Sequence, residues 1–462
     1  MNQVQAKACH ILESRIALVD VSVTSSQRAT ILLTFSLLCL FACGSKAQDR
    51  PGELRSLSPS SLADSIRHAQ GKEVHIFYIH GIGSDGPNDY DSWTLRKSIC
   101  DLVGDCLQPA GSQVGQWDYA NQNEFQIDAP VPQLDYLGEQ VWKNSQEWRA
   151  AAPYAIHFRL DRKTGPSLYV DALNWWPLVF SLKCRQIVVS DAQFVAPDKK
   201  RIVTCSTREE NAGVPLRFKS YDWLDDAKAK QLLNLPSRAV FANKNLKKNT
   251  LDWGFSDAVI ALGPLRTYIL DGIRQLILRS VAAPPGLAPG DHTTPRDNQE
   301  FIIVSHSLGS YLIFSALDIN PTAQKTPTVE QSGNSFEQVL AHTSLVYFFA
   351  NQLRLLELAN LDSGSDKNLA AHLQQWGRIR CDYLKTQAKS MQGCVLPRII
   401  ALNDSNDLLT WTVPALSTVD VRNYPVKNSI RWFWLLENPT RAHDNYAKDK
   451  RIIKEMLQPA LE

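Results

Sequence analysis

The sequence predicts an α/β fold, with a mostly parallel central sheet flanked by helices. Runs of mainly apolar, β-favouring residues occur at 73–79, 301–304, 345–350 and 398–402. They lack the alternation of a half-exposed strand and are typical of strands that are buried on both faces of a parallel sheet. Segments with helical spacing separate several of these runs, as a parallel β-α-β arrangement requires.

The composition is ordinary for a soluble globular protein. The chain has 462 residues, of which 44% are hydrophobic and 21% charged. Its 49 basic and 47 acidic side chains leave a net charge of +2, so nothing in the charge balance favours nucleic acid or another polyanion as a partner.

Residues 1–47 read as a leader. An uncharged apolar run of 14 residues at 29–42 is shorter than the roughly 20 residues that a membrane-spanning helix needs, and it fits the core of a secretory signal. The following residues resemble a bacterial lipobox, in which the chain is cut before a cysteine, here Cys43, that then carries lipid. Cleavage after Ala47 is the alternative and would release a soluble protein. We expect an exported chain, anchored to a membrane through Cys43.

Six further cysteines support export. Cys9, Cys39 and Cys43 lie in the predicted leader. The other six cysteines form three pairs that are close in sequence: Cys100 with Cys106, Cys184 with Cys205, and Cys381 with Cys394. An even number in an exported chain predicts disulfides, most simply within these pairs. Zinc is disfavoured because no C-x-x-C pair or neighbouring histidine cluster accompanies them.

The polar stretch 48–71 is predicted to be a tether that ends in a short helix, and 72–462 is predicted to be the folded domain. The first buried strand, 73–79, runs directly into His80-Gly81-Ile82-Gly83. Glycines there let the backbone approach another group closely.

The range 107–249 is the least regular part of the domain. More than 100 residues between core strands exceed a simple crossover, so we expect a large insertion there. It could form a lid over a site, or an additional core layer around Trp175 and Trp176. A long helix follows at 251–281, interrupted near Gly263-Pro264.

The chain is organised around residues 301–310, where a strand gives way to a helix at Ser305-His306-Ser307-Leu308-Gly309. A residue at such a turn has a strained backbone and projects its side chain at the carboxyl end of the sheet. The following amide lies at a helix N-terminus, and small residues are needed two positions to either side, as Ser305 and Gly309 provide.

This segment resembles the nucleophile elbow G-x-S-x-G of the α/β-hydrolases, with Ser305 in place of the first glycine, and H-G-I-G resembles the family's oxyanion loop. The resemblance covers 73–97 and 250–462. It implies an α/β-hydrolase fold with Ser307 as nucleophile and the amides of Ile82 and Leu308 as oxyanion donors.

The family order of nucleophile, acid and histidine implies the rest of the site. The acid belongs on the loop after a late strand, here 398–402, where Asp404 and Asp407 compete. Asp407 is chosen because Leu408-Leu409 follows it, resembling the family's acid-then-aliphatic pattern, whereas Asp404 fits a turn residue. His443 is then the implied base, because it is the one histidine after Asp407.

The resemblance implies a serine hydrolase of the lipase or esterase type that acts on an ester or lipid and needs no cofactor. An amidase, peptidase or thioesterase on the same scaffold is an alternative, because fold does not determine substrate. The alternative from another class is a non-catalytic lipoprotein that serves as a binding or assembly module.

Overall fold

The computed structural model describes residues 71–82, 152–186, 254–282, 295–317, 336–360, 369–388 and 394–444, with short gaps in the second, third and last of these ranges, together with short strands and single residues elsewhere. The described residues belong to one unit, which comprises 54–432 and 436–462. The predicted leader, with Cys43 and Ala47, lies outside the described residues, as does most of the predicted tether 48–71.

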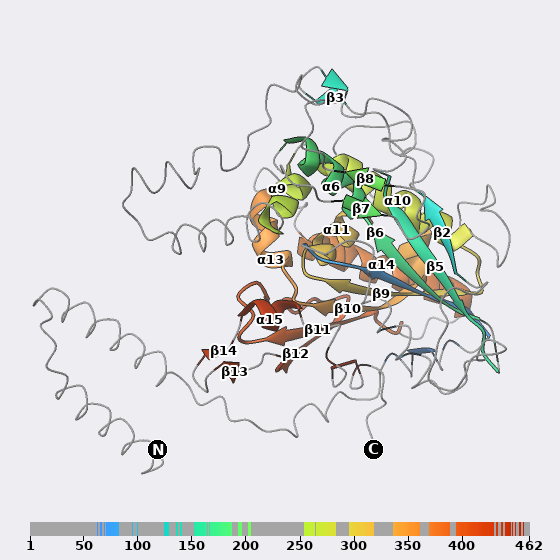
Figure 1. The fold of residues 1–462 in the computed structure, drawn as a ribbon. Coiled ribbons are helices and arrows are strands. Elements are labelled where there is room, and N and C mark those ends of the chain that lie inside the picture. Colours follow the sequence, from blue (N-terminus) through green and yellow to red (C-terminus); the bar gives the residue numbers. More distant parts are fainter. Residues whose placement is uncertain are drawn as a thin grey trace, which may run out of the picture. The chain divides into compact units, whose positions relative to one another are not determined.

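Eight of the described strands form one sheet, in the order β12, β11, β10, β9, β1, β6, β5, β2 (Figure 1). Neighbours from β12 to β6 pair in parallel, whereas β5 is antiparallel to both β6 and β2. The strands are β1 (Glu73–Ile79), β2 (Glu124–Asp128), β5 (Tyr154–Leu160), β6 (Leu168–Asn174), β9 (Gln299–His306), β10 (Thr343–Phe349), β11 (Arg398–Asp404) and β12 (Asp420–Val426). The predicted class, α/β with a mostly parallel sheet, is confirmed.

Among the described strands, three two-stranded ribbons accompany the sheet. They are β3 (Asp135–Tyr136) with β4 (Glu139–Gln140), β7 (Gln193–Val195) with β8 (Ile202–Thr204), and β13 (Arg431–Trp432) with β14 (Leu436–Glu437).

The described helices flank the sheet. They are α6 (Trp176–Gln186), α9 (Ser256–Leu262), α10 (Arg266–Ala282), α11 (Leu308–Ala316), α13 (Leu353–Leu356) with the 3-10 helix η5 (Glu357–Asn360), α14 (Leu369–Ala388) and α15 (Pro439–Asp444). The interruption predicted near Gly263 separates α9 from α10. Within the described residues, no helix has the length and apolarity to cross a membrane.

The central strands are buried on both faces, which explains their mainly apolar sequences. Along β9, Phe301 and Ile303 face one apolar cluster, with residues of α10, α11 and α14. Ile302 and Val304 face the opposite cluster, which includes Leu62, Ile66, Ile452 and Ile453. Successive side chains of a strand point to opposite faces, so each of the two layers receives alternate residues of the same strand.

The range 107–249, expected to be an insertion, supplies β2, β5 and β6 to the central sheet. Strand β6 pairs directly with β1, and its end at Asn174 therefore lies beside the end of β1. Both indole side chains of Trp175 and Trp176 are buried, which favours an additional core layer over a lid for this part of the range.

Candidate active site

Ser307 occupies a sharp turn between strand β9 and helix α11. Its backbone has φ 54° and ψ −127°, a positive φ that costs a non-glycine residue free energy and that is concentrated at functional sites. The turn is fixed from both sides: the Ser307 amide donates to the Phe349 carbonyl at 2.8 Å, and the Ser310 amide donates to the Ser307 carbonyl at 3.1 Å. The strained backbone is therefore held by the end of β10 and by the first turn of α11.

Small residues surround this turn, as the sequence pattern requires. A Cβ on Gly309 would lie 2.5 Å from the His80 carbonyl oxygen, so any side chain there would collide with backbone. Ser305 is fully buried, and its hydroxyl lies 3.0 Å from the Ser310 hydroxyl and donates to the Tyr347 carbonyl at 3.3 Å. The serine that replaces the first glycine of the elbow pattern is thus accommodated by two polar contacts.

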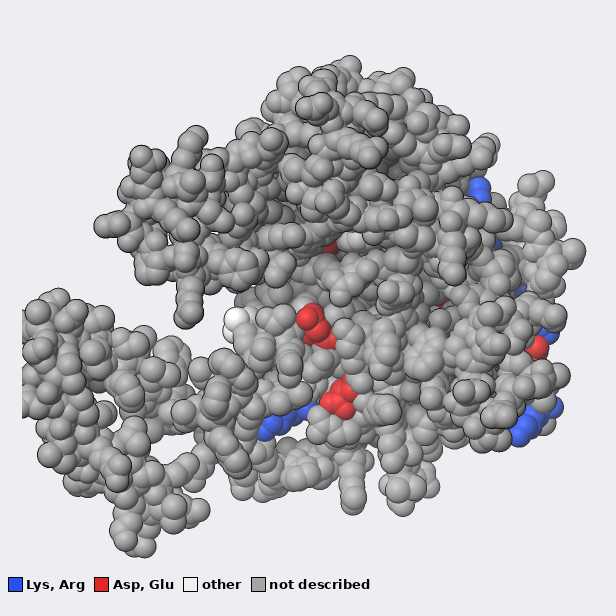
Figure 2. Space-filling model, viewed as in Figure 1, with Lys and Arg blue, Asp and Glu red and all other residues white. Residues whose placement is uncertain are grey.

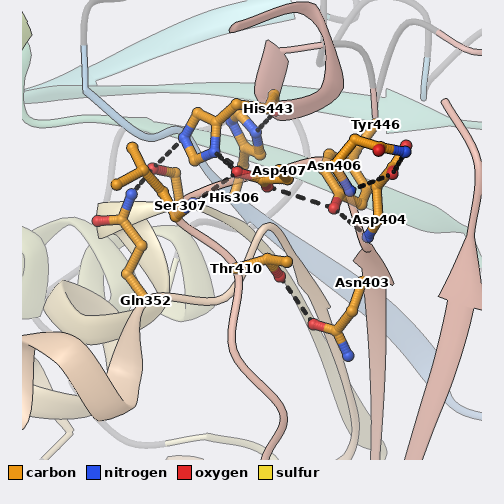
Figure 3. Close-up of polar contacts among 11 residues, drawn as sticks. His306, Ser307, Gln352, Asn403, Asp404, Asn406, Asp407, Thr410, His443 and Tyr446 are labelled. Atoms are coloured by element: carbon orange, nitrogen blue, oxygen red, sulfur yellow. Dashed lines mark hydrogen bonds and ion pairs between the residues drawn. The ribbon is translucent and has the colours of Figure 1, made fainter. Parts of the chain in front are cut away.

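The three predicted triad side chains come together at the carboxyl end of the sheet (Figure 3). His443 Nε2 lies 2.8 Å from Ser307 Oγ, and His443 Nδ1 lies 2.9 Å and 3.1 Å from the two oxygens of Asp407. All three residues are at least nine-tenths buried. A neutral His443 that donates from Nδ1 to Asp407 presents the Nε2 lone pair to the hydroxyl proton of Ser307.

The structure also distinguishes the two candidate carboxylates. Asp404 does not contact His443: its oxygens accept from the backbone and side chain of Asn406 at 2.9 Å and 3.0 Å and from the Asn428 amide at 2.7 Å. Asp404 therefore shapes the loop after β11, as a turn residue does. Asp407 lies three residues further along, where its carboxylate accepts from the Leu409 amide at 2.9 Å and faces the imidazole.

Tyr446 joins the two carboxylate positions, a contact that the sequence analysis did not anticipate. Its hydroxyl accepts from the Asp404 amide at 2.6 Å and donates to Asp407 at 3.3 Å. Burial, and then the negative charge of Asp407, raise the pKa of the Tyr446 hydroxyl above its usual range, so this group remains a hydrogen-bond donor. A tyrosine three residues after the candidate base was the available signal.

His306, which lies between Ser305 and Ser307, contacts the segment that carries His443. Its Nε2 lies 2.8 Å from the backbone carbonyl of His443, and the two rings lie with their centroids 5.3 Å apart. His443 itself belongs to the short helix α15. The contact couples the position of the base to that of the nucleophile.

The segment Gly81-Ile82 lies against the nucleophile. A Cβ on Gly81 would be 2.5 Å from Ser307 Cβ and 3.1 Å from Ser307 Oγ, so only glycine allows this approach. Leu308 opens α11, and the first amides of a helix have no partner within the helix. The backbone that carries the two predicted oxyanion donors, Ile82 and Leu308, thus flanks Ser307 on both sides.

His80 orients the first of these donors. Its Nδ1 lies 2.8 Å from the Gly81 carbonyl oxygen and its Nε2 lies 3.2 Å from Asn174 Oδ1, while its ring stacks on Trp175 at 5.3 Å. The Gly81 carbonyl and the Ile82 amide belong to one planar trans peptide and point in opposite directions. By holding the carbonyl, His80 fixes the direction of the Ile82 N–H.

One predicted disulfide, Cys381–Cys394, is formed. It joins α14 to the segment before β11. The other two predicted pairs lie outside the described residues, since Cys100, Cys106 and Cys205 and the side chain of Cys184 are not among them.

A separate polar cluster lies inside the sheet, on β1, β5 and β6. His75, His157 and Asp171 are fully or almost fully buried, and within the described part of the chain they are the group whose ligand atoms lie close enough to share a metal ion. The two imidazoles, however, contact different oxygens of the Asp171 carboxylate. His75 Nδ1 lies 3.2 Å from Oδ2, and His157 Nδ1 lies 2.5 Å from Oδ1. The carboxylate is therefore satisfied by two imidazoles, which accounts for a buried charge without a metal.

Comparisons of this chain with protein-family models, with curated proteins and with solved structures returned no match.

Proposed function

We propose that this protein is a serine hydrolase with an α/β-hydrolase fold, which cleaves a carboxylic ester or lipid through an acyl-enzyme on Ser307. The observation that carries the proposal is the continuous hydrogen-bonded series from Ser307 through His443 to Asp407, built on a positive-φ turn between a strand and a helix. A buried, ordinary serine-rich turn needs neither the imidazole nor the strained backbone.

The geometry supports a two-step acyl transfer. As Ser307 Oγ attacks the substrate carbonyl carbon, its proton passes to His443 Nε2 and the carbonyl electron pair moves onto oxygen. Asp407 holds the tautomer of His443 and stabilises the imidazolium that forms. The amides of Ile82 and Leu308 would hold the oxyanion, and His443 then returns the proton to the leaving group before water repeats the sequence on the acyl-enzyme.

An apolar substrate is supported by the side chains that follow the site residues. Leu355 and Leu358 on α13 and η5, and Leu408 and Trp411 on the loop after Asp407, are all exposed. Leu408 directly follows the candidate acid Asp407, and exposed apolar side chains beside a site are typical of binding surfaces for apolar ligands. On the face drawn in Figure 2, the described acidic and basic side chains lie in small separate groups.

A fluorophosphonate probe tests the proposal directly. We expect it to label Ser307 in the wild-type protein and not in Ser307→Ala, and we expect His443→Ala to abolish turnover of short p-nitrophenyl esters while its melting temperature stays within a few degrees. An unlabelled wild-type protein that hydrolyses no ester, thioester or amide would favour the alternative, a binding or assembly module. A preference for amides or thioesters over esters would change the substrate class and keep the mechanism.

We also propose that the protein is exported and anchored in the membrane through lipid on Cys43. The disulfide Cys381–Cys394 supports an oxidising compartment, because such bonds are rare in reducing ones. Mass spectrometry of the mature N-terminus distinguishes the forms: a diacylated Cys43 supports the anchor, whereas a free N-terminus at Gln48 indicates cleavage after Ala47 and a soluble product.

A further inference from the structure

A fourth side chain contacts the nucleophile. Gln352, on the segment between β10 and α13, places its amide nitrogen Nε2 2.8 Å from Ser307 Oγ (Figure 3). Its side chain is almost fully buried, so water does not compete for this contact. Ser307 Oγ therefore has two partners at the same distance, His443 Nε2 on one side and Gln352 on the other.

The direction of these two hydrogen bonds follows from counting hydrogens. A serine hydroxyl has one hydrogen to donate and lone pairs to accept with. In the neutral imidazole that a general base requires, His443 donates from Nδ1 to Asp407, so its Nε2 is an acceptor and takes the single hydroxyl hydrogen. Gln352 must then present its N–H to Oγ, since its carbonyl oxygen would have no hydrogen to accept.

The backbone holds Gln352 at this point. The neighbouring Asn351 side chain donates to the Trp411 carbonyl at 3.0 Å and accepts from the Leu353 amide at 2.9 Å, while its carbonyl accepts from the Trp411 amide at 2.8 Å. Ala350, one residue earlier, has a positive φ of 50°. Hydrogen bonds between Asn351 and Trp411 thus connect the segment that carries Gln352 to the loop that carries Asp407. The Phe349 carbonyl, which accepts from the Ser307 amide, connects the same segment to the nucleophile turn.

We propose that Gln352 is a further catalytic residue of this site: its N–H holds Ser307 Oγ with the hydroxyl hydrogen directed at His443 and stabilises the negative charge that grows on Oγ as that hydrogen leaves. This inference rests on the proposed serine-hydrolase function. During attack the O–H bond breaks, the proton goes to His443 Nε2 and the O–C bond forms. A hydrogen bond to Oγ strengthens while charge develops there, and it weakens once Oγ becomes an ester oxygen.

Two substitutions separate this role from a structural one. Gln352→Leu removes the donor, and we expect kcat for a p-nitrophenyl ester and the rate of fluorophosphonate labelling to fall about 100-fold, with KM within about twofold of wild type. Gln352→Glu replaces the donor by a carboxylate that competes for the hydroxyl hydrogen. Once protonated, the introduced carboxyl group would donate again, so the labelling rate of Gln352→Glu relative to wild type should rise as the pH is lowered from 8 to 5.

Gln299 provides the matched control. It is a buried glutamine at the opposite end of β9, and its Nε2 donates to the Val281 carbonyl at 3.2 Å. Gln299→Leu should lower the melting temperature and leave kcat per folded molecule and the pH profile unchanged. Labelling of Gln352→Leu at the wild-type rate, or a pH-independent ratio for Gln352→Glu, would overturn the role of Gln352 while leaving the hydrolase intact. Failure of the wild-type protein itself to be labelled would overturn the proposed function, and this inference with it.

Discussion

The backbone at Gly309 packs directly against the backbone at His80, at the carboxyl end of β1. A Cβ on Gly309 would lie 2.5 Å from the His80 carbonyl oxygen and 2.8 Å from that of Ile79. Because Gly309 has no side chain, the first turn of α11 can pack directly against the backbone that leads into the predicted oxyanion segment. A larger residue at position 309 would therefore displace the nucleophile turn and the backbone next to Ile82 from each other.

Gly309→Ala should accordingly disable the site. The colliding atoms belong to backbone and cannot rotate away, so the helix must shift from β1 and take Ser307 with it. We expect at least a 100-fold loss of kcat, with a lower melting temperature, measured by ester turnover and thermal unfolding. Ser315→Ala, a half-buried position on the same helix, serves as the control and should change neither by much. Wild-type activity in Gly309→Ala would show that the close packing is not required.

The two carboxylates after β11 should behave differently on substitution by asparagine. Asp407→Asn keeps the shape but removes the charge that faces His443, and we expect kcat to fall by about 1,000- to 10,000-fold with a small change in stability. Asp404→Asn weakens the bonds to Asn406 and Asn428, and we expect it to cost about 1–3 kcal/mol of unfolding free energy while kcat per folded molecule stays within about tenfold. Steady-state kinetics and urea unfolding of both variants check this, and a larger kcat loss in Asp404→Asn would reverse the assignment.

How much of this could be predicted from sequence depends on whether a residue carries a local pattern. The buried strands around Ser307 stand out because both of their faces are apolar, and the residues of the elbow stand out because a sharp turn restricts side-chain size. Strand β12 was not predicted: it lies at the edge of the sheet, mixes polar with apolar residues and contains Pro425, so it lacks the continuous apolar pattern of the buried strands.

The side chains that complete the site lacked such a pattern. Gln352, Tyr446 and His306 are ordinary polar residues in sequence, and their roles depend on which loop ends meet at the rim of the sheet. The strand order β11-β10-β9-β1 brings those ends together, and that order follows from long-range packing. Spacing along the chain does not contain this information.

Tyr446→Phe should separate support of the acid from catalysis itself. The change removes the hydroxyl that accepts from the Asp404 amide and donates to Asp407, which leaves a buried amide without that acceptor. We expect a loss of about 1–3 kcal/mol in unfolding free energy and up to about a tenfold fall in kcat. Tyr268→Phe, on a half-buried position of α10, is the control for loss of a tyrosine hydroxyl and should stay within about 0.5 kcal/mol in urea unfolding. Unchanged stability of Tyr446→Phe would contradict the role assigned to this hydroxyl.

The disulfide Cys381–Cys394 should stabilise the domain without contributing to the chemistry. It closes a loop with a sequence separation of 13, for which the chain-entropy model gives about 3 kcal/mol. Replacing both cysteines by serine should therefore lower the unfolding free energy by roughly that amount, with kcat per folded molecule preserved at 25 °C. Urea unfolding under non-reducing conditions measures the difference, and a double variant as stable as wild type would show that α14 and its packing suffice to order this loop.

The buried carboxylate of Asp171 should make the stability of the domain depend on acid. Burial raises its pKa, but the charge of His157 and the hydrogen bonds from both imidazoles outweigh burial and hold the pKa of Asp171 well below its usual range. A carboxylate with a lowered folded-state pKa contributes stability that is fully present above its unfolded pKa of about 3.9 and is lost as the pH falls through the folded-state value.

Asp171→Asn tests this contribution. It removes the charge that pairs with His75 and His157, and we expect it to reduce the unfolding free energy at pH 7 by about 3 kcal/mol, because a buried charged network has lost one partner. The difference between wild type and Asp171→Asn should shrink as the pH is lowered below about 4, because the unfolded wild-type chain binds a proton on Asp171 there while the folded protein keeps the carboxylate ionised, which favours unfolding. Urea unfolding of both proteins from pH 7 to pH 2 gives this difference directly, and one that stays constant or grows toward low pH would show that Asp171 is not the acid-sensitive group of the sheet.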